Sequence, residues 1–136
     1  MKIWFGQGSE HSANLVMIGR FADIRAAKTF EESVRLIQEQ VREEDSEGAM
    51  DWEHPRFSDE ILRLLGERKA YSLVPAEVLQ FALDYRLEAR GTDVVITTDE
   101  IEVSALIKLM IDGGAKVEVY SAHDYPDTPK RNSAAD

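Results

Sequence analysis

The stretch Leu15-Val16-Met17-Ile18-Gly19-Arg20-Phe21 is the most apolar strand-like run of the chain. Its apolar side chains occupy both odd and even positions, and Val16, Ile18 and Phe21 favour an extended backbone. The run is much shorter than the roughly 20 apolar residues that a membrane-spanning helix needs. We therefore expect residues 13–22 to form an interior strand that is covered on both faces of a sheet. A buried helix segment is the alternative interpretation.

The composition predicts one soluble domain. A chain of 136 residues is long enough to bury a core of its own. It contains no cysteine, which excludes disulfides, thiolate metal sites and a cysteine nucleophile. The opening residues 1–6 lack the apolar stretch of a signal peptide, and no segment is long enough to span a bilayer. We expect a soluble, cytoplasmic protein.

The charge balance narrows the class of partner. Sixteen basic residues against 26 acidic ones give a formal charge of -10. Such a charge repels nucleic-acid backbones and anionic lipid surfaces, so direct nucleic-acid or membrane binding is disfavoured. Solubility is the simplest reason for this acidity. The sharper hypothesis is an acidic face that docks a basic partner protein, including one that otherwise holds DNA or RNA.

The first half of the chain contains a strand, a loop, the central strand and a long helix. Residues 2–7 alternate well enough to form a first strand, and residues 8–12 are small and polar, as in a loop. Asp23 is placed to cap a helix over 24–43. The core-facing side of that helix should be formed by apolar residues at three- and four-residue spacing, namely Ala27, Phe30, Val34, Ile37 and Val41.

An acidic surface loop should follow over residues 44–57. The residues Phe57 and Leu62 around Ser58 match a hydrophobic staple with a serine N-cap, which predicts a short helix over 59–68. Pro75 suits the first turn of another brief helix that ends near Gln80. We interpret 58–80 as a short helical insertion.

The clearest alternation in the chain predicts a hairpin. Apolar and charged residues alternate over 81–90, Gly91-Thr92 supplies a tight turn, and 93–98 is the return strand. A helix that continues from Pro75 to Arg90 is the competing interpretation.

The last elements are a second long helix and a final strand. Thr97, Thr98 and Asp99 offer helix caps, and the helix should end at Gly113-Gly114. Its apolar stripe consists of Val103, Leu106, Ile107, Met110 and Ile111. Residues 116–121 then alternate as a strand. We expect one α+β domain over 1–126 and a disordered tail over 127–136.

Without the first strand and the short helices, the order is strand, helix, strand, strand, helix, strand. This is the split βαβ order of ferredoxin-like folds, in which an antiparallel sheet carries two long helices on one face. Strands 13–22 and 93–98 would be interior, with 81–90 and 116–121 outside them. The extra strand 2–7 would either extend an edge or pair with 13–22 and displace the final strand.

The sheet face without helices is a candidate interaction surface. It would present a mixed, partly aromatic set of side chains, namely Arg20, Arg86, Arg90, Lys116 and Tyr120. RNA-binding domains of this topology expose aromatic residues there, but their basic-Gly-aromatic signature is absent from the sequence. We therefore expect a dimer or partner interface on this face and not an RNA site.

One rim of the sheet is a candidate small-molecule site. The antiparallel order should bring the turn before the central strand close to the ends of strands 93–98 and 116–121. The candidate general acid–base residues are His11, His123 and Asp124, and the candidate ligand-binding residues are Glu10, Ser12, Asn14, Thr97 and Ser121. No metal-ligand spacing, phosphate loop or nucleophile elbow occurs, so no metal or cofactor is expected for the leading interpretation. For His11 and for His123, the alternative interpretation is the more common one, a loop residue that caps backbone groups.

Two terminal segments resemble those of a known family. They are Gly8-Ser9-Glu10-His11-Ser12 with Val16-Met17-Ile18-Gly19, and Val117-Glu118-Val119-Tyr120-Ser121-Ala122-His123-Asp124-Tyr125-Pro126. Together they resemble a family of small, uncharacterised bacterial proteins that is classed as a domain of unknown function. The resemblance covers nearly the whole chain. It implies a bacterial source, no activity and no functional residues.

Three functional hypotheses follow. The leading one is a small acidic protein-interaction module of a bacterial multicomponent system, which forms a homodimer or docks onto a larger protein and has no catalysis of its own. The second is a small-molecule-binding protein or enzyme that uses His11 and His123. The third has these histidines hold a divalent metal beside Glu10 and Asp124.

Overall fold

A computed structural model describes residues 2–3, 14–100 and 102–121 of the protein. Its strands are β1 (Lys2–Ile3), β2 (Leu15–Arg20), β3 (Arg86–Arg90), β4 (Asp93–Thr98) and β5 (Lys116–Ser121). The helices are α1 (Ile24–Ser46), α2 (Asp59–Glu67), α3 (Pro75–Val78) and α4 (Ser104–Asp112), and a 3₁₀ turn, η1, spans Leu79–Ala82. The expectation of an α+β fold is confirmed. Residues 4–13 and 122–136, which include both rim histidines and the expected tail, lie outside the described residues.

The strands form one sheet in the order β1-β5-β2-β4-β3. β2 pairs antiparallel with β4 and with β5, and β3 pairs antiparallel with β4. β2 is therefore the interior strand that its apolar run predicts, flanked by the two expected neighbours. β1 extends the edge, because it pairs in parallel with β5 and not with β2.

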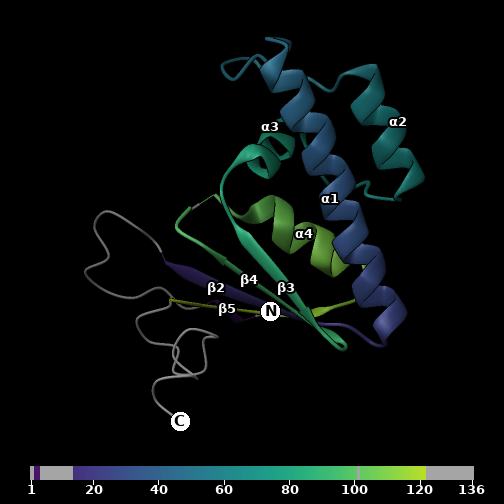
Figure 1. The fold of residues 1–136 in the computed structure, drawn as a ribbon, viewed down its shortest axis with the longest axis vertical. Helices are drawn as coiled ribbons and strands as arrows, with labels where there is room; N and C mark the ends of the chain where they lie inside the picture. Colours follow the sequence, from purple (N-terminus) through teal and green to yellow (C-terminus); the bar gives the residue numbers. More distant parts are fainter. Residues whose placement is uncertain (1, 4–13, 101, 122–136) are drawn as a thin grey trace.

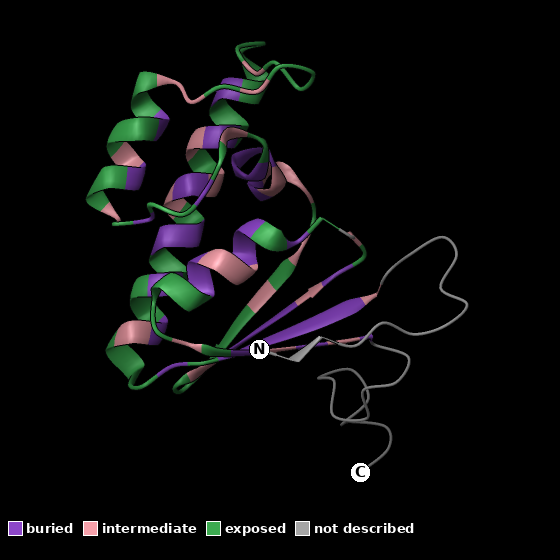
Figure 2. Ribbon diagram, turned by 180° about the vertical axis from the view of Figure 1, so that it is seen from behind, coloured by how far each residue is buried: buried purple, intermediate pink, exposed green. Residues whose placement is uncertain are grey.

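The helices lie on one side of this sheet (Figure 1). Odd-numbered residues of β2, such as Leu15 and Met17, face them and are almost fully buried. The even-numbered Val16 and Ile18 face the other side and form a second, smaller cluster with Val95. The burial colours in Figure 2 show the interior strands as buried nearly end to end. Two covered faces explain why β2 is apolar at both parities.

The long helix α1 begins at the expected cap, since the Asp23 side chain accepts a hydrogen bond from the amide of Ala26 at 2.8 Å. Its expected apolar stripe is confirmed: Ala27, Phe30, Val34, Ile37 and Val41 are all buried. The helix runs to Ser46, so residues 44–46 are helical and do not belong to the loop predicted over 44–57. The reason lies in Glu44, which is buried and bonded to Gln40 and Ser58.

The strand predicted over 81–90 begins only at Arg86, because Phe81 and Ala82 belong to η1. The ladder between β3 and β4 begins at the pair of Arg86 and Thr97. The next residue of β4, Thr98, bonds to the carbonyl of Asp84 through its side-chain hydroxyl, at 2.7 Å. The competing helical interpretation is right up to Ala82 and wrong beyond it.

The second long helix was predicted too long. α4 has nine residues and begins at Ser104, so the proposed caps Thr97 and Thr98 belong to β4 instead. Val103 precedes the helix and gives no side-chain cap. The amide of Ala105 donates to the Gln80 side chain at 2.8 Å, so a residue from η1 caps this helix across the fold.

Candidate functional site

The rim proposed from the sequence exists as a backbone arrangement. Leu15, at the start of β2, pairs with Thr98 at the end of β4 and with Ser121 at the end of β5. Asn14 precedes this rung with a left-handed φ of 45°, a conformation that asparagine tolerates better than most residues. The three strand ends are therefore level. His11, His123, Asp124, Glu10 and Ser12 lie outside the described residues, so their part in a site stays a prediction.

The two other rim candidates lie on different faces of the sheet. Thr97 pairs with Val16 and so faces the helix-free side, whereas Ser121 pairs with Leu15 and is fully buried on the helix side. Their neighbour Thr98 is bonded to the carbonyl of Asp84 and to the amide of Glu100. A single small ligand cannot touch both Thr97 and Ser121 from one side of the sheet.

The register of the strands places the residues of the proposed interaction surface on one face of the sheet. Arg86, Thr97, Val16 and Tyr120 form one cross-strand row. Arg90, Asp93, Arg20 and Lys116 form a second row. All five predicted surface residues, Arg20, Arg86, Arg90, Lys116 and Tyr120, therefore share the helix-free face.

Polar side chains on this face already bond to one another within the chain. Arg20 donates to Asp93 at 3.1 Å and to Glu118 at 3.4 Å, and the Tyr120 hydroxyl donates to Glu118 at 3.2 Å. The apolar centre of the face is covered, because Val16 and Ile18 are only 1% and 4% exposed. The face therefore offers charged groups and little open apolar area, which limits what a partner gains by covering it.

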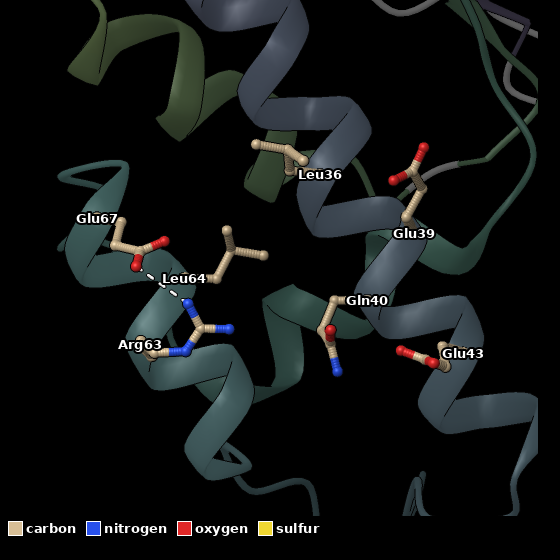
Figure 3. A pocket seen from close by; sticks show the side chains of 7 residues that line it. All are labelled: Leu36, Glu39, Gln40, Glu43, Arg63, Leu64 and Glu67. Carbon is tan, nitrogen blue, oxygen red and sulfur yellow. Dashed lines mark hydrogen bonds and ion pairs between the residues drawn. The ribbon is translucent and has the colours of Figure 1, made fainter.

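A groove that the sequence did not indicate lies between α1 and α2 (Figure 3). It has a volume of about 540 Å³ and is open to solvent. Leu36 of α1 and Leu64 of α2 are both half-buried and point into the space between the helices. The other lining residues are polar, namely Glu39, Gln40, Glu43, Arg63 and Glu67.

The rim of this groove is acidic. Three carboxylates line it against one guanidinium, that of Arg63. Arg63 donates to Glu60 at 3.2 Å and to Glu67 at 3.0 Å, and hydrogen bonds to these two carboxylates raise the pKa of Arg63. Arg63, the one cation among the described lining residues, is therefore held by neighbouring acids, and the remaining rim favours a positively charged occupant.

The groove continues into a more acidic segment, residues 43–60, which we call the acidic tip. The tip contains eight carboxylates and a single arginine, a formal charge of -7 out of the -10 of the whole chain. It comprises the end of α1, the following turn and the start of α2, at the end of α1 that lies farthest from the sheet (Figure 1). Half-exposed Trp52 lies in it and donates its indole N–H to Asp45 at 3.0 Å.

Part of this charge opposes local stability. Glu43, Glu44 and Asp45 stand in the last turn of α1, which has no basic residue. The C-terminus of a helix carries the negative end of the helix dipole, so carboxylates there are unfavourable. At the start of α2, Asp59 and Glu60 are favourable for the same reason. Glu44 is buried and bonds to Ser58, but Glu43 and Asp45 are exposed, and their position against the dipole points to a use other than holding the helix.

Polar bonds at both ends hold α2 against α1. The Ser58 hydroxyl accepts from the amide of Ile61, as predicted for a cap, and donates to buried Glu44 at 2.7 Å. At the other end, Arg68 donates to Ser33 at 2.9 Å and to Glu32 at 2.9 Å. These contacts fix the width of the groove.

The sequence indicated part of this region. Its patterns predict both helices and an acidic segment between them, but residues 44–57 were interpreted as a surface loop. Glu39, Glu43 and Glu67 were not singled out, because nothing in the spacing shows that α2 folds back along α1. The three-to-four-residue spacing of Leu36, Gln40 and Glu43 is the sequence signal that they share one helix face.

Neither a metal cluster nor a membrane span occurs in the part of the chain that the structure describes. Residues 14–100 and 102–121 contain no group of three or more histidines and carboxylates arranged to hold a metal ion. No helix within these ranges combines the length and the apolar character needed to cross a membrane.

Comparison with protein families identifies the chain almost end to end. Residues 1–132 match a family described as a family of unknown function, DUF6375. The resemblance seen in the sequence is thereby confirmed. Comparisons with curated proteins and with solved structures gave no match.

Proposed function

Because the chain belongs to DUF6375, a family without an assigned function, we propose its role from its surface: it is a protein-interaction module that docks a basic partner. The partner segment occupies the groove between α1 and α2, and the acidic tip attracts it. We assign the module to a bacterial, cytoplasmic multicomponent system, and we classify its core as a ferredoxin-like fold with an added edge strand.

The observation that carries this proposal is the concentration of charge. The acidic tip holds -7 of the formal charge in 18 residues, and it borders a groove whose floor is formed by Leu36 and Leu64. An apolar floor with an acidic rim complements an amphipathic helix that has leucine on one face and lysine or arginine beside it. Such complementarity speeds association and selects the partner.

A peptide titration tests this proposal. The probe is a synthetic amphipathic helix of lysine, arginine and leucine, and binding is measured by calorimetry. The variant Glu39→Lys/Glu43→Lys/Glu67→Lys should weaken binding at least about tenfold, since three carboxylates of the rim become cations. The matched control is Asp84→Lys/Glu100→Lys/Glu102→Lys, which changes the net charge equally outside the groove and should bind almost as the parent does.

The control separates docking from general attraction. If both triple variants lose the probe equally, the chain attracts cations through its net charge alone and the groove has no role. A probe that fails to bind the parent protein at all would also refute the proposal.

A second candidate function keeps one observation in its favour. The ends of β2, β4 and β5 are level, which is the arrangement that a His11/His123 site requires. A metal at the same histidines is the third candidate. Measurement of metal content on untagged protein, together with the pKa values of the two imidazoles by NMR, tests both.

A further inference from the structure

The far edge of the sheet offers a second, independent interface. β3 is the terminal strand in the order β1-β5-β2-β4-β3, so among the described strands it pairs only with β4. Four of its five residues are exposed, and Leu87 is half-buried against the core. An edge strand with free backbone groups is a template for another strand.

The turn that follows β3 indicates which of its backbone groups are free. Gly91, with a φ of +62°, and Thr92 form a two-residue turn that closes the β3–β4 hairpin at Arg90 and Asp93. In such a hairpin the closing residues exchange both backbone hydrogen bonds, and the bonding then alternates along the ladder. Arg90, Glu88 and Arg86 therefore bond to β4, whereas the N–H and C=O groups of Leu87 and Ala89 point away from the sheet.

The side chains of β3 are self-complementary when two copies meet. The strand is Arg86-Leu87-Glu88-Ala89-Arg90. A two-fold antiparallel pairing centred on Leu87 joins the free backbone groups of Leu87 to those of its copy. It also sets Arg86 of each chain opposite Glu88 of the other, a non-hydrogen-bonded position where cross-strand side chains lie closest.

The alternative registers are less favourable. Pairing centred on Glu88 sets Glu88 opposite its copy and Arg86 opposite Arg90, so like charges meet at three positions. Pairing centred on Ala89 allows Glu88–Arg90 contacts but places Gly91 of the turn opposite Leu87, which leaves Leu87 without a side-chain partner. Within each chain, Glu88 already accepts from Arg90 at 2.6 Å, so its carboxylate would lie between two arginines in the Leu87-centred dimer.

We propose that two copies of this chain pair through β3 in the Leu87-centred register and form one continuous ten-stranded sheet. The helix-free face is the less suitable dimer interface, because its apolar centre is already covered. The interface is small, so the dimer belongs to the weak class, with a dissociation constant on the order of 100 µM. It leaves the acidic tip of each copy open.

Charge exchange tests the register directly. Sedimentation equilibrium is run on the full chain in about 0.15 M salt, which screens repulsion between the two acidic chains beyond about 8 Å. Arg86→Glu and Glu88→Arg should each weaken self-association at least about tenfold, because each sets like charges opposite one another. An equimolar mixture of the two variants should associate as strongly as the wild type. In the mixed dimer, both acidic positions of one variant face the two basic positions of the other.

Ala89→Pro provides a backbone test. Its amide points to the free edge, so proline removes no bond to β4 but blocks an incoming strand. This variant should stay folded by circular dichroism and become monomeric. Lys116→Glu, on the helix-free face at β5, is the control and should dimerise as the wild type does.

The following outcomes would overturn the proposal. It is wrong if the wild type is monomeric at about 1 mM, where a dimer of this class is well populated. It is also wrong if the mixed variants do not associate, or if Lys116→Glu abolishes the dimer while Ala89→Pro does not. It is wrong as well if Arg90→Glu weakens association and Arg86→Glu does not, the pattern of the Ala89-centred register, or if Arg86→Glu strengthens association, the pattern of the Glu88-centred register.

Discussion

The sheet core and the hairpin of α1 and α2 are held together by different forces. Met17 and Ile96 pair in the middle of the sheet and are fully buried among apolar side chains. Between α1 and α2 the buried contacts of Ile61 and Leu65 are joined by polar bonds at both ends, through Glu44 and Arg68. The sheet is therefore held by apolar packing, whereas the hairpin also depends on polar bonds between its side chains. A charged docking surface can be built on the hairpin without weakening the fold beneath it.

The largest expected effect is a loss of apolar volume in the sheet. Met17→Ala should lower the free energy of unfolding by about 2–5 kcal/mol, because the side chain is fully buried and its removal leaves a cavity. Denaturant unfolding measures this loss. A value below about 1 kcal/mol would mean that the sheet core is not the main source of stability.

Breaking the polar contact at the end of the hairpin should cost less. Arg68→Ala removes the donor to buried Ser33 and an ion pair with Glu32, a loss of about 1–2 kcal/mol. Hydrogen exchange should accelerate in α2 and remain slow in β2. Equal acceleration in both elements would show that the hairpin and the sheet unfold as one unit, and the two regions would then not differ in what holds them.

The ion pair of Glu77 and Lys108 joins α3 to α4 and makes a pH-dependent contribution to stability. Burial opposes ionisation of Glu77, but hydrogen bonds from Lys108 at 2.8 Å and from the amide of Val74 at 3.0 Å outweigh it and lower the pKa of Glu77. Because the folded-state pKa lies below the unfolded one, the stabilisation is complete above about pH 4.5 and is lost as the pH falls through the folded-state pKa.

The variant Glu77→Gln measures this contribution. The wild type should exceed it in the free energy of unfolding by about 1–2 kcal/mol at pH 7, and the difference should shrink below about pH 4.5. A difference that stays constant down to about pH 2 would show that Glu77 acts through packing and not through its charge.

The smallest effect on stability should come from the groove. Arg63 is well exposed, so Arg63→Ala should leave the melting temperature almost unchanged. The same change removes a cation from the rim of the groove and should tighten binding of the basic peptide. A loss of affinity would mean that Arg63 itself contacts the occupant.

Much of the fold follows from the sequence because local patterns determine it. The apolar run of β2, the Asp23 and Ser58 caps and the stripe on α1 are all local, and each was predicted correctly. The errors came from contacts between distant segments. Alternation extended the predicted hairpin strand to Phe81, but its partner β4 ends at Thr98. α4 begins late because its cap is supplied by Gln80, 25 residues earlier.

The candidate sites were predictable to different degrees. The five charged and aromatic residues expected on the helix-free face do share it, because register and parity follow from strand order, while their part in an interface stays a prediction. Thr97 and Ser121 were assigned to one ligand although their parity puts them on opposite faces. The groove was missed, since the packing of α2 along α1 depends on Glu44, Ser58 and Arg68, whose pairing no local pattern shows.

The most direct test of the central claim is an NMR titration of isotope-labelled protein with the basic amphipathic peptide. If partners dock on the hairpin, amide shifts should change along residues 36–67, including the indole N–H of Trp52, and remain unchanged in β2 and β4. Shift changes centred on Arg20, Arg86 and Lys116, or scattered over the whole acidic surface, would contradict the claim.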